Sequence, residues 1–89
     1  MPSTLVQKKL DAGAIVIDVR TPEEFRFGAY PGALNIPIGK LGSLLDDFPK
    51  EHPVVLYCAS GIRSASAALV MKIAGFTDVI DAGGLTDML

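Results

Sequence analysis

The chain has 89 residues, 49% of them hydrophobic, which is enough for one small domain but not for two. Its formal net charge is −2 and its eight lysines and arginines are scattered, so nothing indicates binding to nucleic acid or to an anionic membrane. The sequence shows no apolar run of membrane-spanning length, no signal-peptide pattern and only one cysteine, so we expect a cytoplasmic protein without an internal disulfide.

The N-terminal part of the chain predicts a short helix followed by a buried strand. Ser3 or Thr4 can cap the helix, which supplies a modest apolar stripe for packing. Residues 14–17 form the most apolar short run, which is typical of a strand buried in a parallel sheet. This strand ends at Asp18 and Arg20, so we expect two charged side chains at the carboxyl edge of the sheet.

A capping box begins the second predicted helix. Thr21 can accept a hydrogen bond from the third helical residue, and Glu24 can reach back to the backbone N–H of Thr21. Pro22 suits the first helical position, and Gly28 ends the helix. Glu23 and Glu24 resemble a carboxylate pair for acid–base chemistry, but the capping box explains both, so we assign them no catalytic role.

The middle of the chain predicts a turn, a short strand and a core helix. Residues 30–37 combine a Pro-Gly turn with a short apolar stretch. The apolar face of the following helix is formed by four residues at helical spacing: Leu41, Leu44, Leu45 and Phe48. His52, the only histidine, follows in a polar connector with no cysteine or histidine cluster around it, so we expect no metal and no cofactor.

The second half of the chain predicts a strand, a tight loop and a long helix. Residues 54–57 form a β-branched and aromatic run, and Cys58 follows at the carboxyl end of that strand. From Ser64 the chain is rich in helix formers. Helical spacing assigns four apolar residues to one face of this helix: Ala65, Ala68, Leu69 and Ile73. A last strand over residues 78–81 leads to a terminal turn opened by Gly83-Gly84.

Strands and helices alternate at short spacing, which predicts an α/β fold. We expect a small, mostly parallel sheet of strands three to five residues long, with helices on both faces, in three layers. In such sheets ligands bind just outside the carboxyl ends of strands, where Cys58 lies. Its position therefore favours a functional cysteine over a small buried hydrophobe.

The loop between Cys58 and the predicted helix contains five residues: Ala59, Ser60, Gly61, Ile62 and Arg63. Because the first N–H groups of a helix have no intrahelical partner, we expect several N–H groups of residues 59–63 to point toward the sulfur. These groups, the helix terminus and a nearby guanidinium should hold the pKa of Cys58 below that of a free thiol.

Four motifs in this order resemble the single-domain rhodanese, or thiosulfate sulfurtransferase, family. They are IDVRTPEEF, GAYPGALNIP, the pattern C-x-x-G-x-R-S over residues 58–64, and the late Gly-Gly pair. The resemblance runs from about Ala14 to Gly84. It implies a three-layer rhodanese-like domain that occupies residues 1–89.

The resemblance implies that Cys58 is the nucleophile of a ping-pong sulfur transfer. Its thiolate takes the outer sulfur of thiosulfate, or the sulfur of a persulfide donor, and passes it to cyanide or to a thiol acceptor. The five loop residues and Ser64 would bind the substrate and the persulfide. Asp18 and Arg20 would support the site by pairing with each other or with loop groups. The implied partners are a small anionic sulfur donor and a thiol or small redox-protein acceptor.

The charge of the loop limits the choice of sulfur donor. Arg63 is its only charged side chain, so thiosulfate meets less positive potential than in a loop with several cations. We therefore hypothesise that thiosulfate is accepted without being the physiological donor, and that a protein or small-molecule persulfide fills that role.

Two alternatives stay open. A cysteine-dependent phosphatase also holds an anion between a cysteine and an arginine, but such loops place five residues between the two, whereas four separate Cys58 from Arg63. The other alternative is a rhodanese-like module that binds partners without catalysis. Such a module has no chemical reason to keep an activated thiol, which favours the enzyme.

Overall fold

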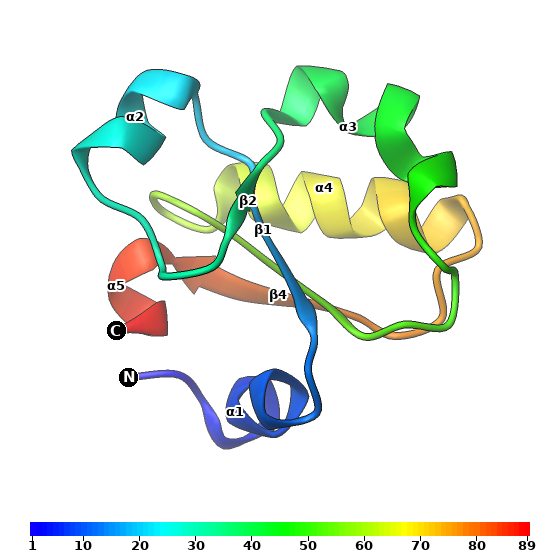
Figure 1. The fold of residues 1–89 in the computed structure, drawn as a ribbon, viewed down its shortest axis with the longest axis horizontal. Coiled ribbons are helices and arrows are strands. Elements are labelled where there is room, and N and C mark those ends of the chain that lie inside the picture. Colours follow the sequence, from blue (N-terminus) through cyan, green and yellow to red (C-terminus); the bar gives the residue numbers. More distant parts are fainter.

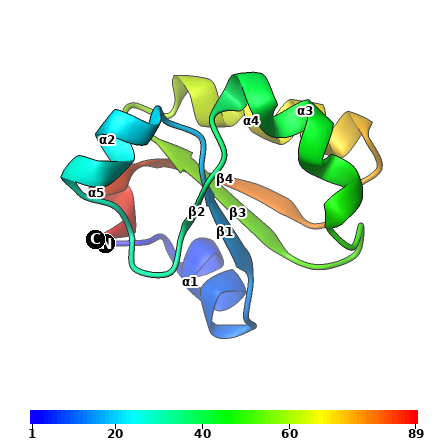
Figure 2. The same ribbon diagram turned by 45° about the horizontal axis from the view of Figure 1, so that its top comes forward.

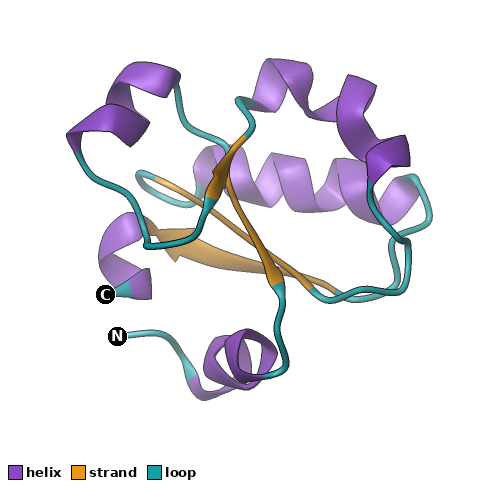
Figure 3. Cartoon of the chain, viewed as in Figure 1, coloured by secondary structure: helices purple, strands orange, loops and turns teal.

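The computed structural model describes all 89 residues and contains one sheet of four parallel strands, in the order β2-β1-β3-β4 (Figure 1). The strands are β1 (Ile15–Asp18), β2 (Leu34–Asn35), β3 (Val54–Cys58) and β4 (Val79–Gly84). The helices are α1 (Thr4–Asp11), α2 (Pro22–Phe27), α3 (Ile38–Leu44), α4 (Ile62–Ile73) and α5 (Leu85–Met88), with a 3₁₀ turn η1 (Leu45–Asp47) after α3 (Figure 3).

Helices cover both faces of the sheet, which confirms the predicted three-layer α/β fold. Side chains of β1 and β3 alternate between two apolar clusters, as the period of a strand requires. One cluster packs Val16 and Val55 against α1 and α5, and the other packs Ile17 and Leu56 against α3 and α4. Figure 2 shows α1 below the strands and α3 and α4 above them. No helix is long and apolar enough to cross a bilayer.

Local signals set the starts of the first two helices as predicted. Ser3 caps α1 by accepting a hydrogen bond from the N–H of Val6 at 3.2 Å. Thr21 and Glu24 form the complete capping box of α2, with Pro22 at its first position. These caps depend on residues three apart in the sequence, so no tertiary contact is needed to specify them.

Of the four residues assigned to one face of α4, only Ala68 is buried. Ala65 is exposed, and Leu69 and Ile73 are 59% and 79% exposed. The buried residues are small or flexible: Ser64, Ala67, Ala68 and Met71. The helix packs on β3 and β4, where small side chains let its backbone approach the sheet closely. Hydrophobic spacing placed Leu69 and Ile73 on the packed face, but close packing against the sheet favours small side chains there, such as Ser64 and Ala67.

The edge strands also differ from the prediction. β2 has only two residues, and β4 extends to Gly84 instead of ending near residue 81. Gly84 pairs with Cys58 after a register shift that begins beyond Leu56, so the Gly-Gly pair belongs to the strand and not to a terminal turn. β4 therefore runs alongside the loop that follows Cys58.

Candidate active site

Cys58 is the last residue of β3 and is fully buried. Its side chain lies in the apolar cluster on the α3 and α4 side of the sheet. The chain then turns within three residues into α4, which begins at Ile62, two residues before the predicted start at Ser64. Gly61 is the N-cap of this helix and has a φ of +96°, a left-handed conformation that glycine adopts without strain.

The sulfur of Cys58 accepts hydrogen bonds from the start of α4. The N–H of Gly61 lies 3.0 Å from Sγ, and the N–H of Ser64 lies 3.4 Å from it. The hydroxyl of Ser64 lies at 3.4 Å as well. Sγ therefore takes the place that a capping side chain would occupy, and it satisfies N–H groups that the helix leaves unpaired.

These hydrogen bonds shift the titration of the thiol. Burial alone would raise the pKa of Cys58, but the Ser64 hydroxyl and the N–H groups of Ser64, Gly61 and Ser60 outweigh burial and hold that pKa below its usual value. This is the direction expected from the sequence. The N–H of Ser64 lies outside the predicted set of residues 59–63, because the helix begins earlier than expected.

The end of β4 contacts both the loop and the start of α4. The hydroxyl of Ser64 lies 3.3 Å from the carbonyl oxygen of Gly83 and can donate to it. A Cβ on Gly84 would overlap the carbonyl oxygen of Ala59, so only glycine allows this approach. The sequence indicated the glycine pair as a turn and as part of a family motif, but not this contact, because it joins segments that lie far apart along the chain.

Asp18 and Arg20 form a buried ion pair at the carboxyl end of β1. The guanidinium donates to both carboxylate oxygens, with the shortest bond, Nη2 to Oδ2, at 2.7 Å. Hydrogen bonding to Asp18 raises the pKa of Arg20 despite its burial. Asp18 lies opposite Tyr57 in the sheet, next to Cys58, but neither charged residue bonds to the loop after Cys58. Their role at the site stays a prediction.

Tyr57 links this ion pair to the segment after α2. Its ring packs against the guanidinium of Arg20 at 5.6 Å, and its hydroxyl accepts a hydrogen bond from the N–H of Tyr30 at 3.0 Å. Arg20 also donates to the carbonyl oxygen of Gly28 at 2.7 Å. Burial raises the pKa of Tyr57 to about 12, so the phenol stays protonated. Sequence reasoning assigned Tyr57 only to the strand and missed this contact.

Arg63 pairs with Glu24, which belongs to α2. Its Nη1 lies 2.7 Å from Oε1 and its Nη2 lies 3.0 Å from Oε2, a bidentate ion pair. Hydrogen bonds from Arg63, and then the N–H of Thr21, lower the pKa of Glu24 to about 2. This ion pair therefore neutralises Arg63, the only cation of the loop. Capping rules did not predict the contact.

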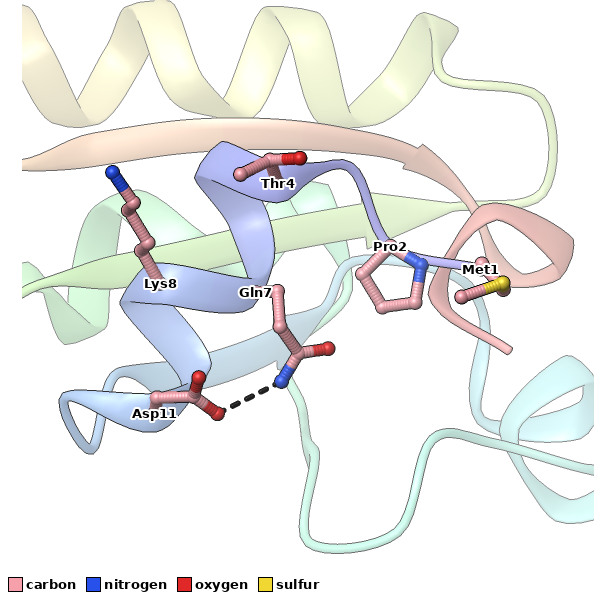
Figure 4. Close-up of a pocket in the computed structure, with 6 residues that line it drawn as sticks. All are labelled: Met1, Pro2, Thr4, Gln7, Lys8 and Asp11. Carbon is pink, nitrogen blue, oxygen red and sulfur yellow. Dashed lines mark hydrogen bonds between the residues drawn. The ribbon is translucent and has the colours of Figure 1, made fainter.

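No group of three histidine, cysteine, aspartate or glutamate side chains is arranged to hold a metal ion. The most evident hollow of the surface, about 360 Å³, lies along α1 and the N-terminal segment (Figure 4). Gln7 and Asp11, which bond to each other at 2.8 Å, are among its lining residues. Because α1 and Cys58 lie on opposite faces of the sheet, this hollow is separate from the cysteine loop.

This geometry prepares one sulfur for nucleophilic chemistry. A thiolate held by N–H groups at a helix start can attack an electrophilic sulfur and can carry the resulting negative charge. Full burial limits access to small or narrow reaction partners.

Known proteins are similar to this chain in sequence, and solved structures are similar to it in fold. The chain is 37% identical to protein YqhL of Bacillus subtilis over 91% of its length and 67% of the relative. It is 36% identical to thiosulfate sulfurtransferase PspE of Escherichia coli, over 81% of the chain and 71% of the relative. With a sulfurtransferase of Allochromatium vinosum the identity is 34%, over 79% of the chain and 65% of the relative. The chain thus spans about two thirds of these relatives.

Similar solved structures are also named as sulfurtransferases or rhodaneses. The human single-domain sulfurtransferase TSTD1 superposes with a TM-score of 0.85 at 28% identity, over 99% of this chain and 95% of that chain. A rhodanese from E. coli, solved with anions, gives a TM-score of 0.80 at 34% identity, over 83% and 89%. The family description "Rhodanese-like domain" matches residues 2–87. On the fold, the relatives and this match, the chain belongs to the rhodanese-like sulfurtransferase family.

Proposed function

We propose that this protein is a sulfurtransferase that carries a sulfane sulfur as a persulfide on Cys58. The observation that supports this most directly is the pair of hydrogen bonds that Sγ accepts from the N–H groups of Gly61 and Ser64, because they stabilise a thiolate and, after reaction, a persulfide. Relatives named as sulfurtransferases support the same reaction class.

In the first half-reaction the Cys58 thiolate attacks the outer sulfur of thiosulfate. The new bond joins Sγ to that sulfur, the sulfur–sulfur bond of thiosulfate breaks, and its electron pair leaves with sulfite. A persulfide donor, R–S–SH, reacts in the same way and releases the thiolate RS⁻. The N–H groups at the start of α4 stabilise the attacking thiolate and, with thiosulfate as donor, the anionic persulfide that forms.

In the second half-reaction an acceptor attacks the terminal sulfur of the persulfide. Cyanide takes this sulfur and becomes thiocyanate, and a thiolate acceptor takes it and becomes a new persulfide. In both cases the electron pair of the broken sulfur–sulfur bond returns to Cys58. A thiol or a small redox protein fits this step, because the buried sulfur requires a narrow nucleophile.

Arg63 bears on the phosphatase alternative. A phosphatase needs a guanidinium free to bind the phosphate oxygens, whereas both arms of Arg63 are bonded to Glu24. The sulfur-transfer proposal requires no such contact, since the N–H groups act on the sulfur itself.

Steady-state kinetics test the proposal. With thiosulfate and cyanide as substrates, we expect thiocyanate release and the parallel double-reciprocal lines of a ping-pong mechanism. Cys58→Ser should abolish release while leaving the circular dichroism spectrum unchanged. Thiocyanate release by Cys58→Ser, or phosphate-ester hydrolysis by the wild type, would contradict the proposal. A folded wild type without transfer would favour the binding-module alternative.

A further inference from the structure

Glu24 lies outside the loop that follows Cys58, yet it pairs with Arg63, the only charged residue of that loop. The carboxylate belongs to α2, 39 residues before Arg63 in the sequence, and bonds to both arms of the guanidinium, at 2.7 Å and 3.0 Å. The side chains of the pair are about one third exposed. The charge of the only cation in the loop is therefore cancelled by the paired carboxylate.

The capping box does not require this negative charge. Oε1 of Glu24 accepts from the N–H of Thr21 at 3.1 Å, which a glutamine oxygen would do equally well. Oε2 takes no part in the cap, and its hydrogen bond goes to Arg63. The helix cap thus explains why residue 24 has a hydrogen-bond acceptor, but not why that residue is ionised.

The arginine at the end of the neighbouring strand β1 is also neutralised. Arg20 is buried against Asp18, and Glu24 pairs with Arg63, so neither guanidinium is free. Hydrogen bonds from N–H groups stabilise charge that forms on the sulfur, but they provide little attraction for a dianion still in solution. A neutral donor loses nothing by this arrangement.

We propose that Glu24 is a specificity-determining residue that cancels the charge of Arg63 and so disfavours small dianionic donors relative to protonated persulfides. This inference rests on the proposed sulfur transfer. The donor class it names is R–S–SH, whose terminal sulfur is taken by the Cys58 thiolate while RS⁻ leaves with the electron pair. The transferred sulfur keeps its proton during this step, and the proton is released to water afterwards.

The test is Glu24→Gln, which keeps the cap and removes the charge. At low ionic strength we expect the KM for thiosulfate to fall roughly three- to tenfold with little change in kcat, because one guanidinium charge is released. The fall should be smaller for an organic thiosulfonate, a monoanion, and should vanish at high salt. A change in loop packing would affect both donors equally and would not depend on salt.

Two control variants separate charge from structure. Glu23→Gln removes the same charge one residue away, from an exposed side chain that is not the ion-pair partner of Arg63, and should leave KM unchanged. Glu24→Asp keeps the charge in a shorter side chain and should keep KM close to the wild-type value. If Glu24 had only a structural role, Glu24→Asp would resemble Glu24→Gln.

A binding measurement makes the inference independent of turnover. In a Cys58→Ser background, calorimetry should show that Glu24→Gln binds thiosulfate roughly three- to tenfold more tightly. If the wild type transfers no sulfur but this tightening is found, the proposed function fails and the charge effect stands. An unchanged dissociation constant, or an equal change in Glu23→Gln, overturns the inference on Glu24 while leaving sulfur transfer intact.

Discussion

The N–H of Gly61 donates a hydrogen bond to the sulfur of Cys58 at 3.0 Å, so the N-cap residue of α4 also holds the nucleophile. This contact joins the helix start, the left-handed turn at Gly61 and the reactive atom in one small unit. Ser64 closes the unit from within the helix and connects it to β4 through Gly83.

The first prediction concerns the acidity of Cys58. Because hydrogen bonds outweigh burial in setting its pKa, the thiolate should form at lower pH in the folded protein than in the urea-unfolded chain. Ser64→Ala removes the hydroxyl, so the titration should move to higher pH. Ultraviolet absorbance of the thiolate measures both, without requiring a reagent to reach the buried sulfur. Identical titrations of folded and unfolded protein would refute the predicted shift.

The second prediction concerns the contact between Gly84 and Ala59. Gly84→Ala should displace the Ala59 carbonyl, lower sulfur-transfer activity at least tenfold and cost about 2 kcal/mol of unfolding free energy. Gly42→Ala is the matched control, since its Cβ meets nothing within 4 Å and lies in α3. It should raise stability slightly through helix propensity and keep activity. Urea unfolding and the thiocyanate assay measure both variants, and equal behaviour would contradict the packing account.

The third prediction concerns the ion pair of Asp18 and Arg20. Asp18→Asn leaves the guanidinium buried without its counter-charge, so we expect a loss of about 3 kcal/mol in the free energy of unfolding. Asp46→Asn, at a fully exposed side chain, should leave stability unchanged. Urea denaturation compares the two. A small effect of Asp18→Asn would mean that water or a relaxed backbone replaces the pair.

The fourth prediction concerns the pH dependence of stability at Glu24. Its folded pKa of about 2 lies below the unfolded value, so ionised Glu24 stabilises the protein above the unfolded pKa. This contribution declines as pH falls from about 4.5 toward 2. Since the pair is partly exposed, we expect Glu24→Gln to cost only about 1 kcal/mol at neutral pH, with the difference vanishing near pH 2. Urea unfolding of both proteins across this range measures it, and a constant difference would contradict the linkage.

The sequence predicted the features whose causes are local. The capping box at Thr21 and Glu24, the cap at Ser3 and the alternating strands follow from residues a few positions apart, and the structure confirms them. Cys58 could be located because strand, loop and helix are consecutive in the chain. Such features can be predicted from the sequence because interactions between residues a few positions apart specify them.

Contacts between segments that lie far apart along the chain could not be predicted from the sequence. The buried face of α4 depends on how closely the helix approaches β3 and β4, and hydrophobic spacing does not report that distance. The role of Gly84 depends on the carbonyl of Ala59, and that of Glu24 on Arg63. In both cases a local role already explained the residue: a turn for Gly84 and a helix cap for Glu24. The sequence therefore provided no reason to expect a tertiary contact as well.

The most direct test of the central claim is the intact mass of the reduced protein after incubation with thiosulfate, measured beside Cys58→Ser. We predict a gain of one sulfur atom in the wild type, no gain in the variant, and loss of that sulfur on addition of cyanide. An unchanged wild-type mass with the fold intact, or an equal gain in Cys58→Ser, would contradict a persulfide on Cys58.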